Sequence, residues 1–180
     1  MRHVKTTFLL LGLLMICLTG AQSQQQSFDI NEGLVTGSLT ELRTKRHVFL
    51  MVRRSAVLDT RGRAESILKE VYRPDPLTTQ RFARTYNTIA GKLNKYMGKY
   101  KSISAARDIS EAEFIVYFNL IEYRSTFGQP YPYGEMFVIL NDRSGVNGPH
   151  IIWKTRKSPI WAEDAIKELI RDLKATRGEG

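Results

Sequence analysis

A stretch without acidic residues lies between Asp75 and Asp108 and carries seven basic side chains. If this stretch is helical, four of the seven fall within about 80° of one another, beside an apolar stripe. These four are Arg81, Arg84, Lys92 and Lys95. A one-sided basic helix attracts polyanions through its summed field, so the pattern indicates a surface for an acidic polymer or an anionic lipid membrane. The alternative is a solvated face that only aids solubility.

Segment 125–134 holds two prolines, two glycines and three aromatic rings, those of Phe127, Tyr131 and Tyr133. It is long for a hairpin connection, and its composition favours a stiff loop that displays flat apolar surface. The three rings are therefore candidate contacts for a macromolecular partner. The alternative is that they fold back and cover the domain's own core.

Residue types that perform catalysis or bind metals lack the spacing that either chemistry needs. His47 and His150 precede separate segments, and no cysteine or histidine follows at zinc-ligand spacing. Neither a serine nucleophile elbow nor a glycine-rich phosphate loop is present. The sequence therefore predicts no catalytic residue and no cofactor. A hydrolase whose site is assembled from scattered residues is kept as an alternative.

Acidic residues do not form a clear site either. Glu111 and Glu113 lie two apart where a strand is expected to begin, which favours a solvated strand entrance. Three oxygen-bearing side chains share one loop: Asn141, Asp142 and Asn147. A single carboxylate is little for calcium, which takes six to eight oxygen ligands, so we expect no metal site.

The first 23 residues have the three parts of a secretory signal. Arg2 and Lys5 begin it, an apolar run follows, and small residues end it. The apolar run is too short to span about 30 Å of hydrocarbon comfortably. We expect cleavage after Ser23 or Ala21 and export to the periplasm or the medium of a bacterium. After cleavage the chain is not expected to be an integral membrane protein, and nucleic acid becomes an unlikely partner.

Cys17 does not fit a lipid-attachment site, because a small residue should precede a lipidated cysteine and Ile16 stands there. The chain beyond residue 23 has no other cysteine, so its core must stabilise it without disulfides. Removing Arg2 and Lys5 with the signal lowers the net charge from +9 to +7. The whole sequence has 180 residues, of which 42% are hydrophobic and 25% are charged, as in one ordinary globular domain.

The elements that must position these residues follow from hydrophobic periodicity. We expect a polar tether over 24–44, one α/β domain over 45–176 and a frayed tail over 177–180. Strands are predicted at 48–52, 100–105, 114–124, 135–140 and 151–155. Helices are predicted at 64–72, at 79–97 with Gly98 as its stop, and at 159–173 with Ser158 as its cap. This order predicts an α+β fold, a mixed sheet with helices packed on it.

The strand texture also carries a family resemblance. The segments EAEFIVYF, GEMFVIL and IIWKTRKS, with a closing amphipathic helix, resemble small exported bacterial domains whose fold is similar to the amino-terminal domain of TolB. The likeness covers residues 46–175, implies an α/β domain of the cell envelope and assigns no catalytic or binding residue. The sequence as a whole predicts a non-catalytic exported domain that binds a macromolecular partner, such as an envelope protein. Binding of a polyanion or an anionic membrane through the basic helix is the alternative.

Overall fold

A parallel pair of strands, β1 and β3, forms the middle of a mixed sheet. The computed structural model describes residues 33–54, 63–74, 82–143, 145 and 147–180. Its main strand order is β2-β1-β3-β4-β5, and β6 pairs with β4. β1 runs parallel to β2 and β3, while β4 is antiparallel to β3, β5 and β6. The strands are β1 (His47–Arg53), β2 (Ser104–Ala105), β3 (Phe114–Thr126), β4 (Gln129–Leu140), β5 (His150–Lys154) and β6 (Ile160–Trp161).

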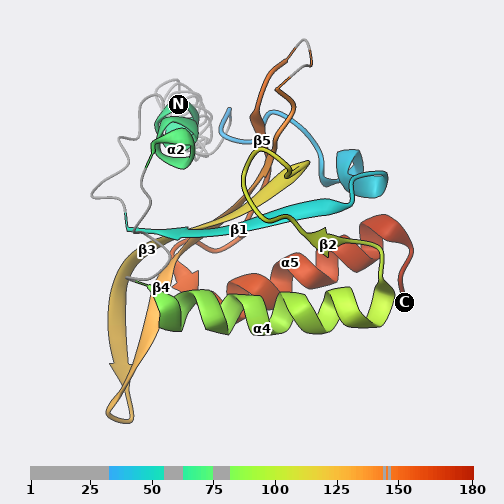
Figure 1. The fold of residues 1–180 in the computed structure, drawn as a ribbon. Coiled ribbons are helices and arrows are strands. Elements are labelled where there is room, and N and C mark those ends of the chain that lie inside the picture. Colours follow the sequence, from blue (N-terminus) through green and yellow to red (C-terminus); the bar gives the residue numbers. More distant parts are fainter. Residues whose placement is uncertain (1–32, 55–62, 75–81, 144, 146) are drawn as a thin grey trace, which may run out of the picture. The chain divides into compact units, whose positions relative to one another are not determined.

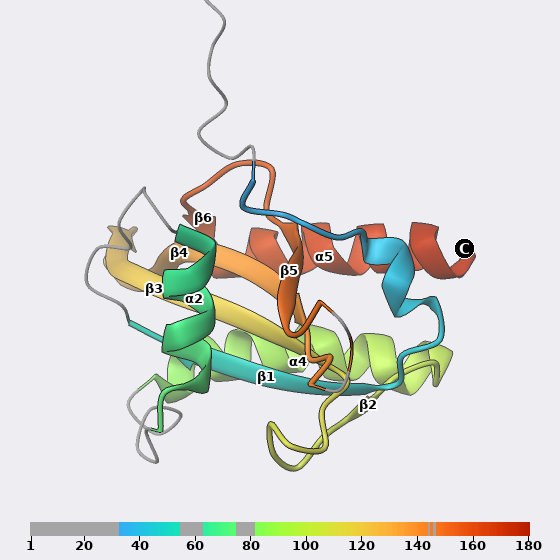
Figure 2. The same cartoon turned by 90° about the horizontal axis from the view of Figure 1, so that it is seen from above.

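Helices cover both faces of this sheet, as Figures 1 and 2 show. α4 (Ala83–Tyr100) and α5 (Ala162–Arg177) lie side by side on one face, and α2 (Arg63–Tyr72) lies on the other. A short 3-10 helix, η1 (Leu39–Arg43), precedes β1. The α+β class and the mixed sheet predicted from the sequence are confirmed. None of the helices among the described residues is both long enough and apolar enough to cross a membrane.

Each face of the sheet builds its own hydrophobic core, because the central strands are apolar on both sides. Val116 and Phe118 of β3 contact the cluster that includes Leu169 of α5, whereas Ile115 and Tyr117 belong to the cluster beneath α2. The alternation predicted for this strand is therefore confirmed as far as Leu120. Beyond Leu120 it is wrong, because the register shifts there and Tyr123, expected on the same face as Tyr117, lies beside Thr85 of α4. β1 is likewise buried on both faces, as its two-sided apolar run indicates.

The alternation of the strand predicted at 151–155, which corresponds to β5, places Ile151, Trp153 and Thr155 on one face, and this is wrong for Ile151 and Trp153. Ile151 faces the α2 side, but Ile152 and Trp153 both belong to the core beneath α4 and α5. The register between β4 and β5 shifts between Val138 and Ile139, and such a bulge breaks strict alternation.

Two predicted helix boundaries also differ from the structure. α4 continues past Gly98 to Tyr100 and ends at Lys101, whose φ of 55° is left-handed. Ser158 does not cap α5, because Ile160–Trp161 first pairs with β4 and the helix begins only at Ala162. Thr78 and Thr79, whose side chains could cap the helix predicted over 79–97, lie outside the described residues.

The chain before β1 packs onto the domain within the described residues. Leu42 is fully buried, and Leu34 and Leu39 are buried too. The backbone N–H groups of Thr36 and Gly37 both donate to Ile151 O, at 3.0 and 3.4 Å. Residues 34–43 thus form part of the folded unit.

A buried ionic network joins α2 to the sheet. Arg63 donates to the carboxylate of Glu135, and the Ser158 hydroxyl donates to the same carboxylate at 2.6 Å. Burial alone would raise the pKa of Glu135, but the hydrogen bonds from Arg63 and Ser158 outweigh it and hold that pKa below 4.5. Nearby, the buried Arg53 donates to Glu70 O and to Arg73 O.

Candidate interaction surface

Segment 125–134 is not the long loop predicted from its prolines and glycines. Its residues continue strands β3 and β4 into a hairpin that is closed by Phe127 and Gly128 alone. These two residues have φ of 51° and 74°. Positive φ at both positions is typical of the type I′ turn, whose twist matches that of paired strands. Tyr131 and Tyr133 are therefore strand residues, and only Phe127 occupies the turn.

The direction of the hairpin follows from a bulge at Ile121. The register of β3 and β4 shifts between Leu120 and Glu122, and an extra residue in one strand bends it. Gly134 lies opposite Leu120, where an added Cβ would sit 2.1 Å from Asn119 O. Glycine permits this close backbone approach. Figure 1 shows the hairpin curling past the N-terminal ends of α4 and α5.

Large hydrophobic side chains are exposed on this hairpin. In the described part of the chain four such side chains are exposed, and all belong to it: Ile121, Tyr123, Phe127 and Tyr131. Phe127 stands out, with a relative exposure of 102% against 38–44% for the others. A ring so placed is not part of the protein's own core.

The tyrosines of the hairpin pack on the domain. Tyr133 lies between the guanidinium of Arg124, 3.6 Å from its ring centre, and the ring of Trp161, at 5.0 Å between centroids. Tyr131 meets Trp161 edge-on at 6.3 Å, and the Tyr123 hydroxyl lies 2.9 Å from Thr85 Oγ1 in α4. These contacts hold the hairpin against the domain. Tyr133 therefore packs on the domain, as one of the two alternatives predicted. Phe127 is exposed, as the other alternative predicted.

A hollow of about 400 Å³ lies between the hairpin and the N-terminal ends of the two helices. Tyr131, Pro132 and Trp161 give it an apolar wall, and Arg84 and Glu163 line its polar side. The structure thus brings together one residue from each of the two sequence-predicted surfaces, Tyr131 and Arg84. The sequence does not mark Trp161 as a site residue, because its spacing from the apolar residues that follow suits the buried stripe of a helix.

The four residues of the predicted basic face do not form a uniform basic surface. Arg81 lies outside the described residues. Lys92 pairs with Glu163 of α5 at 3.2 Å, and Lys167 pairs with the same carboxylate at 2.9 Å. Hydrogen bonds from Lys167 and Lys92 hold the pKa of Glu163 below its ordinary value. Among the described members of the face, Arg84 and Lys95 are exposed.

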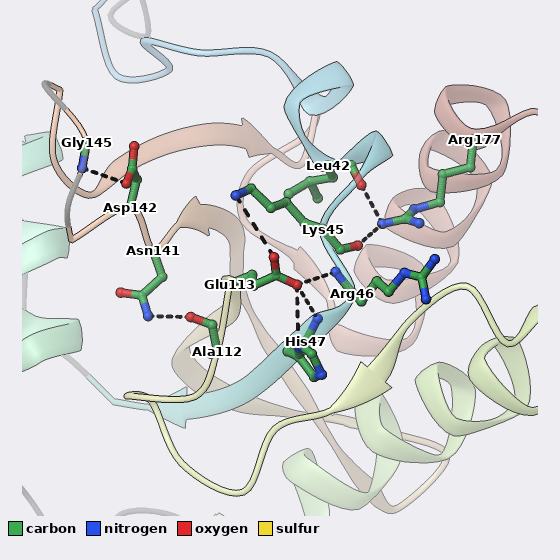
Figure 3. Close-up of polar contacts among 10 residues, drawn as sticks. All are labelled: Leu42, Lys45, Arg46, His47, Ala112, Glu113, Asn141, Asp142, Gly145 and Arg177. Atoms are coloured by element: carbon green, nitrogen blue, oxygen red, sulfur yellow. Dashed lines mark hydrogen bonds and ion pairs between the residues drawn. The ribbon is translucent and has the colours of Figure 1, made fainter.

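The polar residues that the sequence offered for catalysis or metal binding have structural partners. Glu113 accepts hydrogen bonds from the backbone N–H of Arg46 and of His47, as Figure 3 shows, and lies 4.0 Å from Lys45 Nζ. Burial alone would raise the pKa of Glu113, but these hydrogen bonds and the Lys45 charge hold it below its ordinary value. His47 Nδ1 lies 3.3 Å from the same carboxylate.

His150 and the loop that holds Asn141 and Asp142 also form structural contacts. His150 Nε2 lies 3.3 Å from Glu41 Oε2. The amide of Asn141 donates to Ala112 O at 2.6 Å, and Asp142 accepts from Gly145 N at 2.7 Å. No group of three or more potential metal ligands occurs in the part of the chain that the structure describes.

Comparisons with known proteins add little to this geometry. No family model and no curated protein matches the chain. Among solved structures, the chain is similar to a PelC dodecamer from Paraburkholderia phytofirmans, at 13% sequence identity and a TM-score of 0.32. The match covers 75% of this chain and 87% of that chain. A likeness at this level says nothing about what this chain binds.

Proposed function

We propose that this protein is a non-catalytic domain of the bacterial cell envelope that binds a partner protein through the β3–β4 hairpin. The observation that carries the proposal is Phe127, a large apolar ring that is fully exposed in a left-handed backbone conformation. That conformation costs an ordinary residue roughly 1–2 kcal/mol, and asparagine would adopt it more readily. Phe127 therefore neither suits the backbone conformation of the turn nor contributes its ring to the core. A residue that is unfavourable in both respects points to a function.

The surroundings of Phe127 suit a protein contact. Ile121 and Tyr131 are partly exposed on the same hairpin, and aromatic anchors dominate the binding energy of protein interfaces. The hairpin is held by the packed ring of Tyr133 and by the contact of the Tyr123 hydroxyl with Thr85, so little conformational entropy would be lost when a partner binds.

Replacing Phe127 with asparagine tests the proposal, because Asn-Gly is the preferred pair for this turn. We expect the free energy of unfolding to rise by up to about 1 kcal/mol, since asparagine tolerates the left-handed conformation. Retention of a defined partner from envelope extract should fall at least tenfold. Urea unfolding measures the first effect, and quantitative mass spectrometry of proteins retained on the immobilised chain measures the second.

Phe127→Tyr is the matched control, because it keeps both the ring and the backbone conformation. It should retain the partner as the natural chain does, in a manner insensitive to salt. Loss of one partner in Phe127→Asn but not in Phe127→Tyr supports the proposal. If no protein depends on Phe127 and the chain instead adheres to anionic vesicles in a salt-sensitive manner, the polyanion alternative replaces it.

Export is part of the proposal and has its own test. We expect the protein recovered from the periplasm or the medium to begin at Gln22 or Gln24, so that Cys17 is removed with the signal and no lipid is attached. The physical basis is the short apolar run with small residues at its end. Intact-mass measurement decides the point. A mass that includes residues 1–21, or one increased by a diacylglyceryl group, contradicts it.

A further inference from the structure

The opposite end of the domain carries a second, basic hollow. About 790 Å³ of space lies between the chain that leads into β1 and the C-terminal ends of α4 and α5. Four basic side chains and one acidic side chain line it: Arg43, Arg46, Lys101, Arg177 and Glu179. We call this set the basic groove. Figures 1 and 2 place the hairpin tip and the C-terminus at opposite ends of the domain.

Arg177 builds the groove rather than reaching out of it. Its guanidinium donates to Leu42 O and Lys45 O, as Figure 3 shows, and so ties the end of α5 to the entrance of β1. Nη1 also donates to Ser102 O at 3.5 Å, so three donors of Arg177 are used within the fold and Arg177 contributes mainly its positive charge to the groove. The Glu113 carboxylate accepts a hydrogen bond from the backbone N–H of Arg46 and so holds the Arg46 backbone in place.

Three basic side chains remain available at the groove. Arg46 and Lys101 are exposed, and their side chains form no hydrogen bond or ion pair with any described residue. In Figure 3 the Arg46 side chain turns away from Glu113. Arg43 uses only Nε, which donates to Thr176 O at 3.2 Å, so its two terminal nitrogens are unused among the described residues. Two guanidinium groups and one ammonium group therefore surround one hollow.

The charge of the groove indicates the ligand's charge. The C-termini of α4 and α5 each contribute about half a negative charge there, and Glu179 contributes one more. The four cations still leave an excess of about two positive charges. A phosphate monoester carries about −1.5 to −2 at pH 7, whereas a carboxylate carries only −1. Guanidinium groups also match phosphate oxygens in paired hydrogen bonds.

We infer that the basic groove binds a phosphate monoester attached to a larger body, such as a sugar phosphate or a phosphorylated lipid headgroup. The volume of the hollow supports a ligand larger than phosphate itself, because small-molecule sites measure about 300–1,000 Å³ and inorganic phosphate alone would fill little of it. This site is separate from the hairpin, and it does not depend on the function proposed for Phe127.

Calorimetry with the purified full chain tests the inference, with glucose 1-phosphate as the probe and glucuronate as the carboxylate comparison. Flotation with vesicles of phosphatidylcholine that contain phosphatidic acid supplies the lipid arm. We expect a phosphate monoester in at least one arm to bind at least tenfold more tightly than glucuronate. Binding only to vesicles assigns the phosphate to a lipid headgroup, and binding of glucose 1-phosphate assigns it to a soluble sugar.

Two triple variants of equal charge separate the groove from net charge. The groove variant is Arg43→Gln, Arg46→Gln and Lys101→Asn, in which asparagine suits the left-handed φ of 55°. The control variant removes three exposed charges that do not line the groove: Arg54→Gln, Lys69→Gln and Lys157→Gln. The groove variant should weaken binding at least tenfold and the control less than twofold. Equal losses in both variants, or no binding of either phosphate monoester to the natural chain, overturn the inference.

A single variant, Glu179→Gln, tests the same inference independently if the groove variant fails to fold. The carboxylate of Glu179 accepts a hydrogen bond from Tyr96, and a glutamine oxygen can accept the same bond. Removing this negative charge should tighten phosphate binding at least threefold while the melting temperature stays within a few degrees. Unchanged or weaker binding in this variant contradicts the assignment.

Discussion

Replacing Phe118 with alanine is expected to lower the free energy of unfolding by about 3–5 kcal/mol. Phe118 is fully buried in β3 and belongs to the core beneath α4 and α5. Truncation leaves a cavity in a layer held from both sides by rigid elements, so little relaxation can fill it. Since a domain of this size is stabilised by about 5–15 kcal/mol, the variant should lose much of its stability. Urea unfolding of both proteins measures the difference.

The same truncation at an exposed site is the matched control. Phe127→Ala removes the same atoms from the turn of the hairpin, where the ring is fully exposed. We expect that variant to change the free energy of unfolding by no more than about 0.5 kcal/mol. Equal effects at the two positions would show that Phe118 does not face the helices.

Replacing Glu135 with alanine is expected to cost a further, separate 3–5 kcal/mol or so, because it leaves the charge of Arg63 without its buried partner. Glu135 has an exposed fraction of 7% and accepts hydrogen bonds from Arg63 and Ser158. Glu122→Ala is the control, since Glu122 pairs with Arg124 on the surface and such pairs contribute about 1 kcal/mol or less. Comparable losses in the two variants would contradict the structural role of Glu135.

The pH dependence of the Glu135 contribution follows from its lowered pKa. A carboxylate with a depressed pKa stabilises the folded state fully above its unfolded value of about 4.5, and the contribution disappears as the pH falls through the folded pKa. The stability gap between the natural chain and Glu135→Gln should therefore be constant near pH 7 and narrow below pH 4.5. Urea unfolding at pH 7 and at successively lower pH measures this, and a gap that does not narrow contradicts it.

The elements of the fold could be predicted because most of them carry a local signal. The alternation of β3 up to Leu120 and the helical spacing from Ile89 to Tyr96 are each set by burial on one face or both, and the structure confirms them. The hairpin was missed because prolines and glycines usually mark loops. Here Gly134 instead admits the backbone of Asn119, and Pro130 and Pro132 lie in β4 near its turn. The resemblance to the amino-terminal domain of TolB stays a prediction.

The candidate sites were harder to predict, because they depend on contacts between distant segments. The ion pair of Lys92 with Glu163 joins α4 to α5, and no residue spacing in the sequence predicts this contact. The basic groove likewise combines residues from η1, the entrance to β1 and two helix ends, and the first and last of these residues are more than a hundred positions apart in the sequence. Phe127 was found from composition alone, although its left-handed backbone was not.

The way in which the chain closes its sheet also bears on aggregation. An open strand edge invites strand addition by another chain. Here β2 is only two residues long, and Thr36 and Gly37 cover Ile151 on the outer side of β5. The ladder between β1 and β3 ends at Asn119, and the outer half of β3 beyond it carries the Glu122–Arg124 ion pair. Charged side chains on an open strand edge discourage fibril-like stacking, so the hairpin that exposes Phe127 is protected against backbone pairing with other copies of the chain.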